Sequence, residues 1–74
     1  MITGPQIRAA RAILGWTIAD LSDRTRLSKS SIQRAETSSG APTMRAENLS
    51  RLLRTLEAAG AVFTPDGQIR DGPF

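Results

Sequence analysis

Leucine residues in the second half of the chain repeat with the spacing of one helix face. Leu49, Leu52, Leu53 and Leu56 recur at i, i+3, i+4 and i+7, which is the strongest periodicity in the sequence. The pattern predicts a helix over residues 43–59, and Gly60 is placed to end it as a C-terminal cap. Such a stripe closes a hydrophobic core and leaves surplus apolar surface for a second subunit.

A shorter pattern at the start of the chain predicts another helix, over residues 5–14. Thr3 and Gln6 have the spacing of a capping box, which opens a helix. One face of this helix carries Ile7, Ala10, Arg11 and Leu14. Arg11 is the odd residue on this inward face, because a buried charge needs a partner. Glu36 is the natural candidate for that partner.

Residues 17–36 predict two short helices joined by a tight turn. Thr17 and Ser28 can each cap a helix by accepting a backbone N–H of its first turn. The apolar side chains between and after these caps again follow helical spacing, at Ile18, Leu21, Ile32 and Ala35. One short apolar face per helix cannot be buried alone, so the two helices must pack on each other and on a third element.

The outward face of the second short helix, residues 28–36, is the candidate functional surface. If Ile32 and Ala35 point inward, the opposite arc carries Lys29, Ser30, Gln33 and Arg34. All four side chains donate hydrogen bonds and none is acidic, which suits a surface that meets phosphate oxygens or the N7 and O6 edges of purines. The simpler interpretation is a solvated helix face that happens to lack acids.

The run WTIADLSDRTRLSKSSIQRAE, residues 16–36, resembles the helix-turn-helix of the lambda-repressor, Cro and Xre-like family of transcriptional regulators. The resemblance extends more loosely over residues 5–63. It implies a small all-α domain of four helices, in which the second helix of the motif lies in the DNA major groove and the first crosses the backbone. It also implies an ion pair between Arg11 and Glu36, which orients the recognition helix without touching DNA.

Three positions of the motif depart from the family pattern. Arg26 stands where the family has a glycine in a left-handed conformation, and an arginine there costs about 1 kcal/mol of strain if that geometry is kept. Either the turn differs slightly from the family pattern or stability is lost there. Ser22 replaces a small alanine at the closest approach of the two helices. Ile18 replaces a glutamine that bonds a phosphate or a base, so the backbone N–H groups at this helix start must hold the phosphate instead.

Contacts with the DNA backbone are expected from the helix starts and from the loop after the motif. Residues 37–42, TSSGAP, form this loop by composition, and the resemblance places it against the sugar-phosphate backbone. The expected phosphate ligands are Thr17, Ile18, Ser28, Thr37, Ser38 and Ser39.

The charge of the chain is unevenly distributed. Ten Lys and Arg against seven Asp and Glu give a net charge of +3. Residues 1–35 carry six bases and two acids, whereas the remaining residues carry four bases and five acids. The positive half contains most of the motif, as expected for a surface that binds a polyanion.

The sequence has no cysteine and no histidine. The thiolate and imidazole ligands of zinc and the usual neutral-pH general base are therefore missing, and we expect no metal, no cofactor and no enzymatic activity. No apolar run approaches the roughly 20 residues of a membrane span, and the N-terminus lacks the basic start and apolar core of a signal peptide. We expect a cytoplasmic protein without a membrane partner.

The last segment, residues 61–74, differs in kind from the helical domain of residues 1–60. Residues 62–64 and 68–70 flank a Pro-Asp-Gly turn and predict a short β-hairpin, followed by a loose end at residues 71–74. A two-stranded ribbon is barely stable alone, so it must fold back on the long helix or pair with the tail of another protomer. The residues expected at a homodimer contact are Leu53, Leu56, Val62 and Phe63.

Together these features predict a sequence-specific regulator that binds double-stranded DNA. We expect a repressor or autoregulator that acts as a homodimer on an inverted repeat through the helix at residues 28–36. A second class of function stays open, in which the helix-turn-helix serves protein interaction, as in an antitoxin or antirepressor that masks a partner protein. The two hypotheses differ in the task of the cationic helix face.

Overall fold

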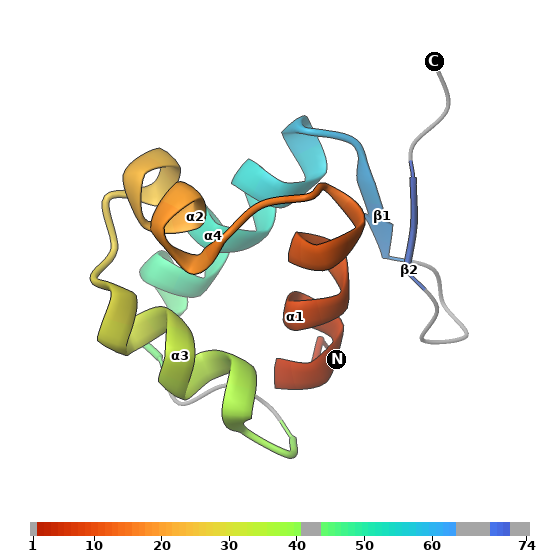
Figure 1. Ribbon diagram of the computed structural model, residues 1–74. Coiled ribbons are helices and arrows are strands. Elements are labelled where there is room, and N and C mark those ends of the chain that lie inside the picture. The colour runs from red at the N-terminus through yellow and green to blue at the C-terminus, as the bar shows by residue number, and fades with distance from the viewer. Residues whose placement is uncertain (1, 41–43, 64–68, 72–74) are drawn as a thin grey trace.

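The computed structural model describes residues 2–40, 44–63 and 69–71, and within these ranges the chain forms four helices and two strands. The elements are α1 (Gly4–Ile13), α2 (Ile18–Thr25), α3 (Lys29–Thr37), α4 (Ala46–Ala58), β1 (Ala61–Phe63) and β2 (Ile69–Asp71). α1 lies between α3 and the two-stranded ribbon, and α4 contacts α1, α2 and β1 (Figure 1). The predicted fold, a small helical domain with a short C-terminal β element, is confirmed.

One hydrophobic core lies among the four helices and β1. Its buried members are Ile7, Ala10, Leu21, Leu27, Ile32, Leu52, Leu56 and Ala61. Every inward helix face predicted from the spacing of apolar residues contributes to this core. No helix could bury its face alone, so each depends on the others for stability.

Side-chain caps fix where the first two helices begin. At the start of α1, Gln6 Oε1 accepts the Thr3 N–H at 2.7 Å and Thr3 Oγ1 accepts the Gln6 N–H at 3.4 Å, which is the predicted capping box. Thr17 and Asp20 form the same reciprocal arrangement at the start of α2, at 2.9 and 3.0 Å. Each box satisfies two backbone donors that a helix start leaves unpaired.

The fourth helix is shorter than predicted. It begins at Ala46 and ends at Ala58, and it has no side-chain cap; residue 43, its predicted start, lies outside the described residues. Gly60 follows with a φ of 111° and donates its N–H to Glu57 O at 3.0 Å, so it ends the helix as predicted. Neither α4 nor any other helix in the described part has the length and apolar character to cross a membrane.

The C-terminal strands pair antiparallel within the chain. Ala61 lies opposite Asp71, so the paired strands cover residues 61–63 and 69–71, one residue away from the predicted positions. Asp71 belongs to β2, and the expectation that the loose end starts there is wrong; the predicted turn at residues 65–67 lies outside the described residues. Both strands contact α1, and β1 also contacts α4, which supports the ribbon on two helices rather than one.

The turn between α2 and α3 contains the left-handed residue that the sequence predicted. Arg26 has φ 62° and ψ 25°, and its N–H donates to Ser22 O at 2.7 Å. Ser22 Oγ donates to Leu27 O at 2.6 Å, and Thr25 Oγ1 donates to Leu21 O at 2.7 Å while accepting the Leu27 N–H. This set of hydrogen bonds holds the turn against the strain of an arginine in that conformation.

Gly4 meets the end of α3 at a distance that only glycine permits. A Cβ added at Gly4 would overlap the backbone carbonyl oxygens of Ala35, Glu36 and Ser38. The Gly4 N–H also donates to Gly40 O at 3.2 Å. The start of α1 is therefore docked directly on the backbone at the end of α3.

Replacing Arg26 by glycine should stabilise the domain. Glycine adopts the left-handed conformation without steric cost, so the free energy of unfolding should rise by up to about 1 kcal/mol. For a domain of this size that gain raises the melting temperature by about 4–8 °C in a thermal melt followed by circular dichroism. A clear fall in melting temperature would show that the arginine side chain contributes more than its backbone strain removes.

Replacing Gly4 by alanine should destabilise the domain, because the new methyl group meets backbone atoms that cannot rotate away. Overpacking of this kind lowers the free energy of unfolding by about 1–3 kcal/mol, measured by urea denaturation. Gly40→Ala is the matched control, since no atom lies within 4 Å of a Cβ added there. Equal stabilities for the two variants would contradict the close approach of α1 and α3.

Candidate nucleic-acid interface

The candidate recognition surface is the outward side of α3. Ser28 caps this helix by accepting the Ser31 N–H on Oγ at 3.1 Å. Its inward side chains, which are buried, are Ile32, Ala35 and Glu36. The side chains predicted to read bases are all exposed, namely Lys29, Ser30, Gln33 and Arg34. Neither cation of this set forms an ion pair with a residue that the structure describes, so both keep their donors for a ligand.

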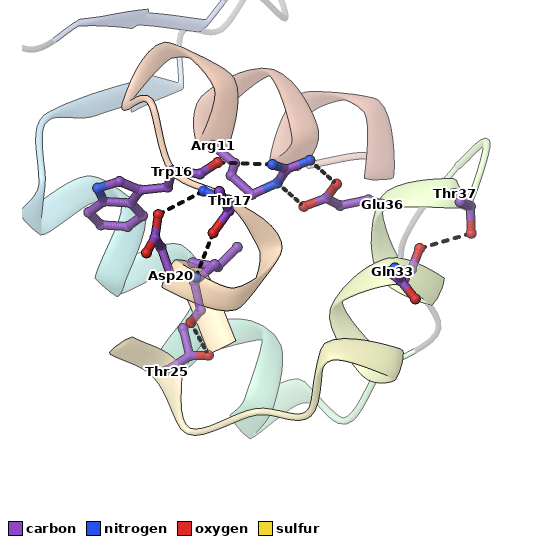
Figure 2. A network of polar contacts seen from close by, with 9 residues as sticks. Arg11, Trp16, Thr17, Asp20, Thr25, Gln33, Glu36 and Thr37 are labelled. Atoms are coloured by element: carbon purple, nitrogen blue, oxygen red, sulfur yellow. Dashed lines mark hydrogen bonds and ion pairs between the residues drawn. The ribbon is translucent and has the colours of Figure 1, made fainter. Parts of the chain in front are cut away.

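A buried ion pair fixes α3 to α1. Arg11 Nε lies 2.8 Å from Glu36 Oε2, and Arg11 Nη2 donates to Glu36 Oε1 at 3.0 Å (Figure 2). Arg11 Nη1 donates to Trp16 O at 2.9 Å, which extends the contact to the segment before α2. The hydrogen bonds that Arg11 donates to Glu36 raise the pKa of Arg11, outweighing the opposite effect of burial. The pair that the sequence predicted is present, and neither of its charges remains available to DNA.

The start of α2 offers two backbone donors. Asp20 Oδ2 accepts the Thr17 N–H and Thr17 Oγ1 accepts the Asp20 N–H (Figure 2). The N–H groups of Ile18 and Ala19, in the same first turn, have no acceptor among the residues that the structure describes. The hydrogen bonds from the Thr17 backbone and side chain lower the pKa of Asp20, so its carboxylate is charged at neutral pH. A phosphate bound here would meet two N–H groups and the dipole of α2, but also a neighbouring negative charge.

Arg24, in the last turn of α2, reaches the residue before Thr17. Its guanidinium stacks over the Trp16 ring, 4.3 Å from the ring centroid. Trp16 is partly buried against the core, in keeping with a packing role. Arg24 is therefore engaged within the protein and is not counted among the cations that could bind a polyanion.

Hydroxyl groups at the end of α3 are turned toward the helix itself, and Thr37, expected in the loop, is the last residue of the helix. Thr37 Oγ1 donates to the carbonyl of Gln33 or of Arg34, at 3.0 and 3.2 Å, and Ser38 Oγ donates to Arg34 O at 3.0 Å. Ser28 Oγ likewise donates to Ser31 Oγ at 2.8 Å while it caps α3. These three hydroxyl groups were expected to donate to phosphate. To do so, each would first have to give up the internal hydrogen bond that it donates here. Ser39 is exposed and has no such bond with the residues that the structure describes.

A groove runs between α1, the start of α2 and α3. Its volume is about 870 Å³, and its lining residues are Pro5, Arg8, Ile18, Ser30, Gln33, Arg34, Glu36, Thr37, Ser38 and Ser39. It brings together residues predicted to read bases and residues predicted to bind phosphate, which come from separate parts of the sequence. Thr17, Ser28 and Lys29 lie outside the lining.

The sequence analysis missed Arg8, which lines this groove from α1 together with Pro5. A signal for it was present, because Arg8 precedes Arg11 by one helical turn and so shares the side of α1 that faces α3. Identifying the groove also required the relative position of α1 and α3, which local patterns do not contain.

The residues expected at a dimer contact have different environments. Leu56 is 0 % exposed in the core of its own chain, so the expectation that it contacts a second subunit is wrong. Leu53 and Phe63 are partly buried against the same core. Val62 is 37 % exposed, the largest exposed fraction of these four.

α3 is a short helix that is held by its buried face and exposes a row of hydrogen-bond donors, and the capped helix α2 precedes it. This is the arrangement of a helix-turn-helix protein. Residues 7–58 match the helix-turn-helix family of the lambda-repressor, Cro and Xre type. The match covers more than half of the chain, and the protein belongs to this family of DNA-binding transcription regulators. Comparison with curated proteins and with solved structures gave no match.

Proposed function

We propose that the protein is a repressor that places α3 in the major groove of double-stranded DNA. The observation that carries the proposal is the exposed face of α3, whose four polar side chains donate hydrogen bonds and include no acid. Among them, the guanidinium of Arg34 matches the O6 and N7 acceptors of guanine, and the amide of Gln33 matches the N6 and N7 positions of adenine.

Phosphate contacts would set the position of α3 along the groove. The N–H groups of Ile18 and Ala19 and the exposed Ser39 supply donors, and Ile18 and Ser39 line the same groove as Arg34. The ammonium of Lys29, in the first turn of α3, adds a donor outside the lining of that groove. Such contacts carry little sequence information themselves, but they fix the register in which the base-reading side chains act.

A homodimer would give the site enough length to be specific. One recognition helix reads only a few base pairs, and two copies related by a two-fold axis read half-sites about 34–36 Å apart on an inverted repeat. A protein bound in this way across a promoter blocks transcription by occupying the DNA. A promoter that drives the protein's own gene would make it an autoregulator.

Two arginines of equal charge test whether α3 reads bases. Arg34→Ala should weaken binding to the cognate site by about 1–3 kcal/mol and relax the preference at one base pair. Arg54, exposed on α4, is the matched control, and Arg54→Ala should change affinity little for any sequence. Gel-shift titrations of both variants on cognate and random duplexes measure the difference.

Equal losses for these two variants would mean that attraction to DNA is diffuse. If Arg34→Ala and Lys29→Ala both left DNA binding unchanged, the reading-face proposal would fail. The hypothesis of a helix-turn-helix that masks a protein partner would then be the better one.

The dimer surface is proposed to lie at β1, where Val62 is exposed. Val62→Asp puts a charge at the centre of this contact and should yield monomers in sedimentation equilibrium, with weak and salt-sensitive DNA binding left. Val62→Thr keeps the β-branched shape and serves as control. Phe63 is less suited to the test because its side chain packs on the core. A wild-type protein that stays monomeric at micromolar concentration, with and without DNA, would exclude the dimer.

A further inference from the structure

The groove beside the reading face has one wall that does not belong to the helix-turn-helix pair. Pro5 and Arg8 of α1 form this wall, across from Gln33 and Arg34 of α3. Two contacts fix the position of this wall relative to α3: the docking of Gly4 on the end of α3, and the ion pair between Arg11 and Glu36. Arg8 therefore sits on a rigid element whose position relative to α3 is fixed.

The groove carries an uncompensated positive charge. Glu36 is the only acidic residue in its lining; the side chain of Glu36 is 5 % exposed, and both of its oxygens are bound by Arg11. Arg8 is exposed and makes no ion pair or hydrogen bond with the residues that the structure describes. Two guanidinium groups, from Arg8 and Arg34, thus face an open groove with no free carboxylate in it.

We propose that Arg8 binds a phosphate of the DNA strand that borders the major groove, so that α1 acts as a third DNA-contacting helix. This proposal rests on the proposed function, because it requires α3 to lie in the groove. With α3 inserted, base edges face the outward side chains of α3, and the wall formed by α1 stands beside them, where the sugar-phosphate backbone passes. A guanidinium group binds phosphate through two parallel hydrogen bonds, which fixes orientation as well as charge.

A phosphate contact at Arg8 would also explain how the protein manages without the glutamine that its family often has at the start of α2. Ile18 leaves that helix start with backbone donors only, next to the charged Asp20. Arg8 lines the same groove as Ile18 and supplies a positive charge close to this site. The cation on α1 offsets the repulsion that Asp20 exerts on a phosphate.

Salt dependence and chemical interference on DNA test this assignment. Arg8→Gln should lower affinity about fivefold to tenfold on cognate and random duplexes alike, and should reduce the slope of log K against log salt by about 0.9. The ratio of cognate to random affinity should stay the same. Arg8→Lys should keep the slope, and Arg54→Gln, at an exposed position on α4, should leave affinity and slope unchanged.

Phosphate ethylation gives the position of the contact. With wild-type protein, ethylation of particular phosphates should prevent binding, and Arg8→Gln should remove the interference at one phosphate per half-site and leave the rest. An unchanged slope and an unchanged interference pattern would overturn the assignment of Arg8 while leaving the proposed function intact. A change in base preference would instead show that Arg8 reads a base. Absence of duplex binding by the wild-type protein would overturn the proposed function itself.

Discussion

The docking of α1 on the end of α3 is the contact on which the reading surface depends. α3 has only nine residues, too few to hold an orientation by its own stability. Arg11 donates two hydrogen bonds to Glu36, and Gly4 allows the backbone of α1 to lie against the carbonyl groups at the end of α3. Both side chains of this ion pair are largely buried, and among the described residues neither has another partner of opposite charge. The pair therefore constrains the orientation of α3 relative to α1. Loss of either contact would leave the donor face of α3 intact but less firmly oriented, because only the remaining contact, the core packing of α3 and its contacts with α2 would then hold it.

The sequence alone predicted those parts of the structure that short-range patterns determine. The capping box of Thr3 and Gln6, the cap at Thr17 and the four inward helix faces all depend on residues within one or two helical turns, whereas the resemblance to the family indicated the left-handed position at Arg26. The partner of Arg11 was also predictable, because a charge on an inward face needs a counter-charge and the resemblance to the family indicated Glu36. The exposed donors of α3 followed from the same periodicity, although their role on DNA remains a proposal.

Other features depend on how elements meet in space, and the sequence did not reveal them. Nothing in the local pattern marks Gly4 as a contact with a distant carbonyl group, and Arg8 lines the groove only because of the placement of α1 beside α3. The leucine stripe identified a face of α4 but could not distinguish the wholly buried Leu56 from the partly buried Leu53. The hydroxyl groups of Thr37 and Ser38 were expected to face phosphate, yet they donate to carbonyl groups of α3.

Dimethyl sulfate footprinting tests most directly whether α3 occupies the major groove. The reagent methylates N7 of guanine in the major groove and N3 of adenine in the minor groove, and the same duplex reports both. On a site enriched from a random pool of duplexes, the bound protein should protect guanine N7 at positions repeated in two inverted half-sites, and adenine N3 should remain reactive there. Protection of adenine N3 with guanine N7 fully reactive would contradict the placement of α3 in the major groove.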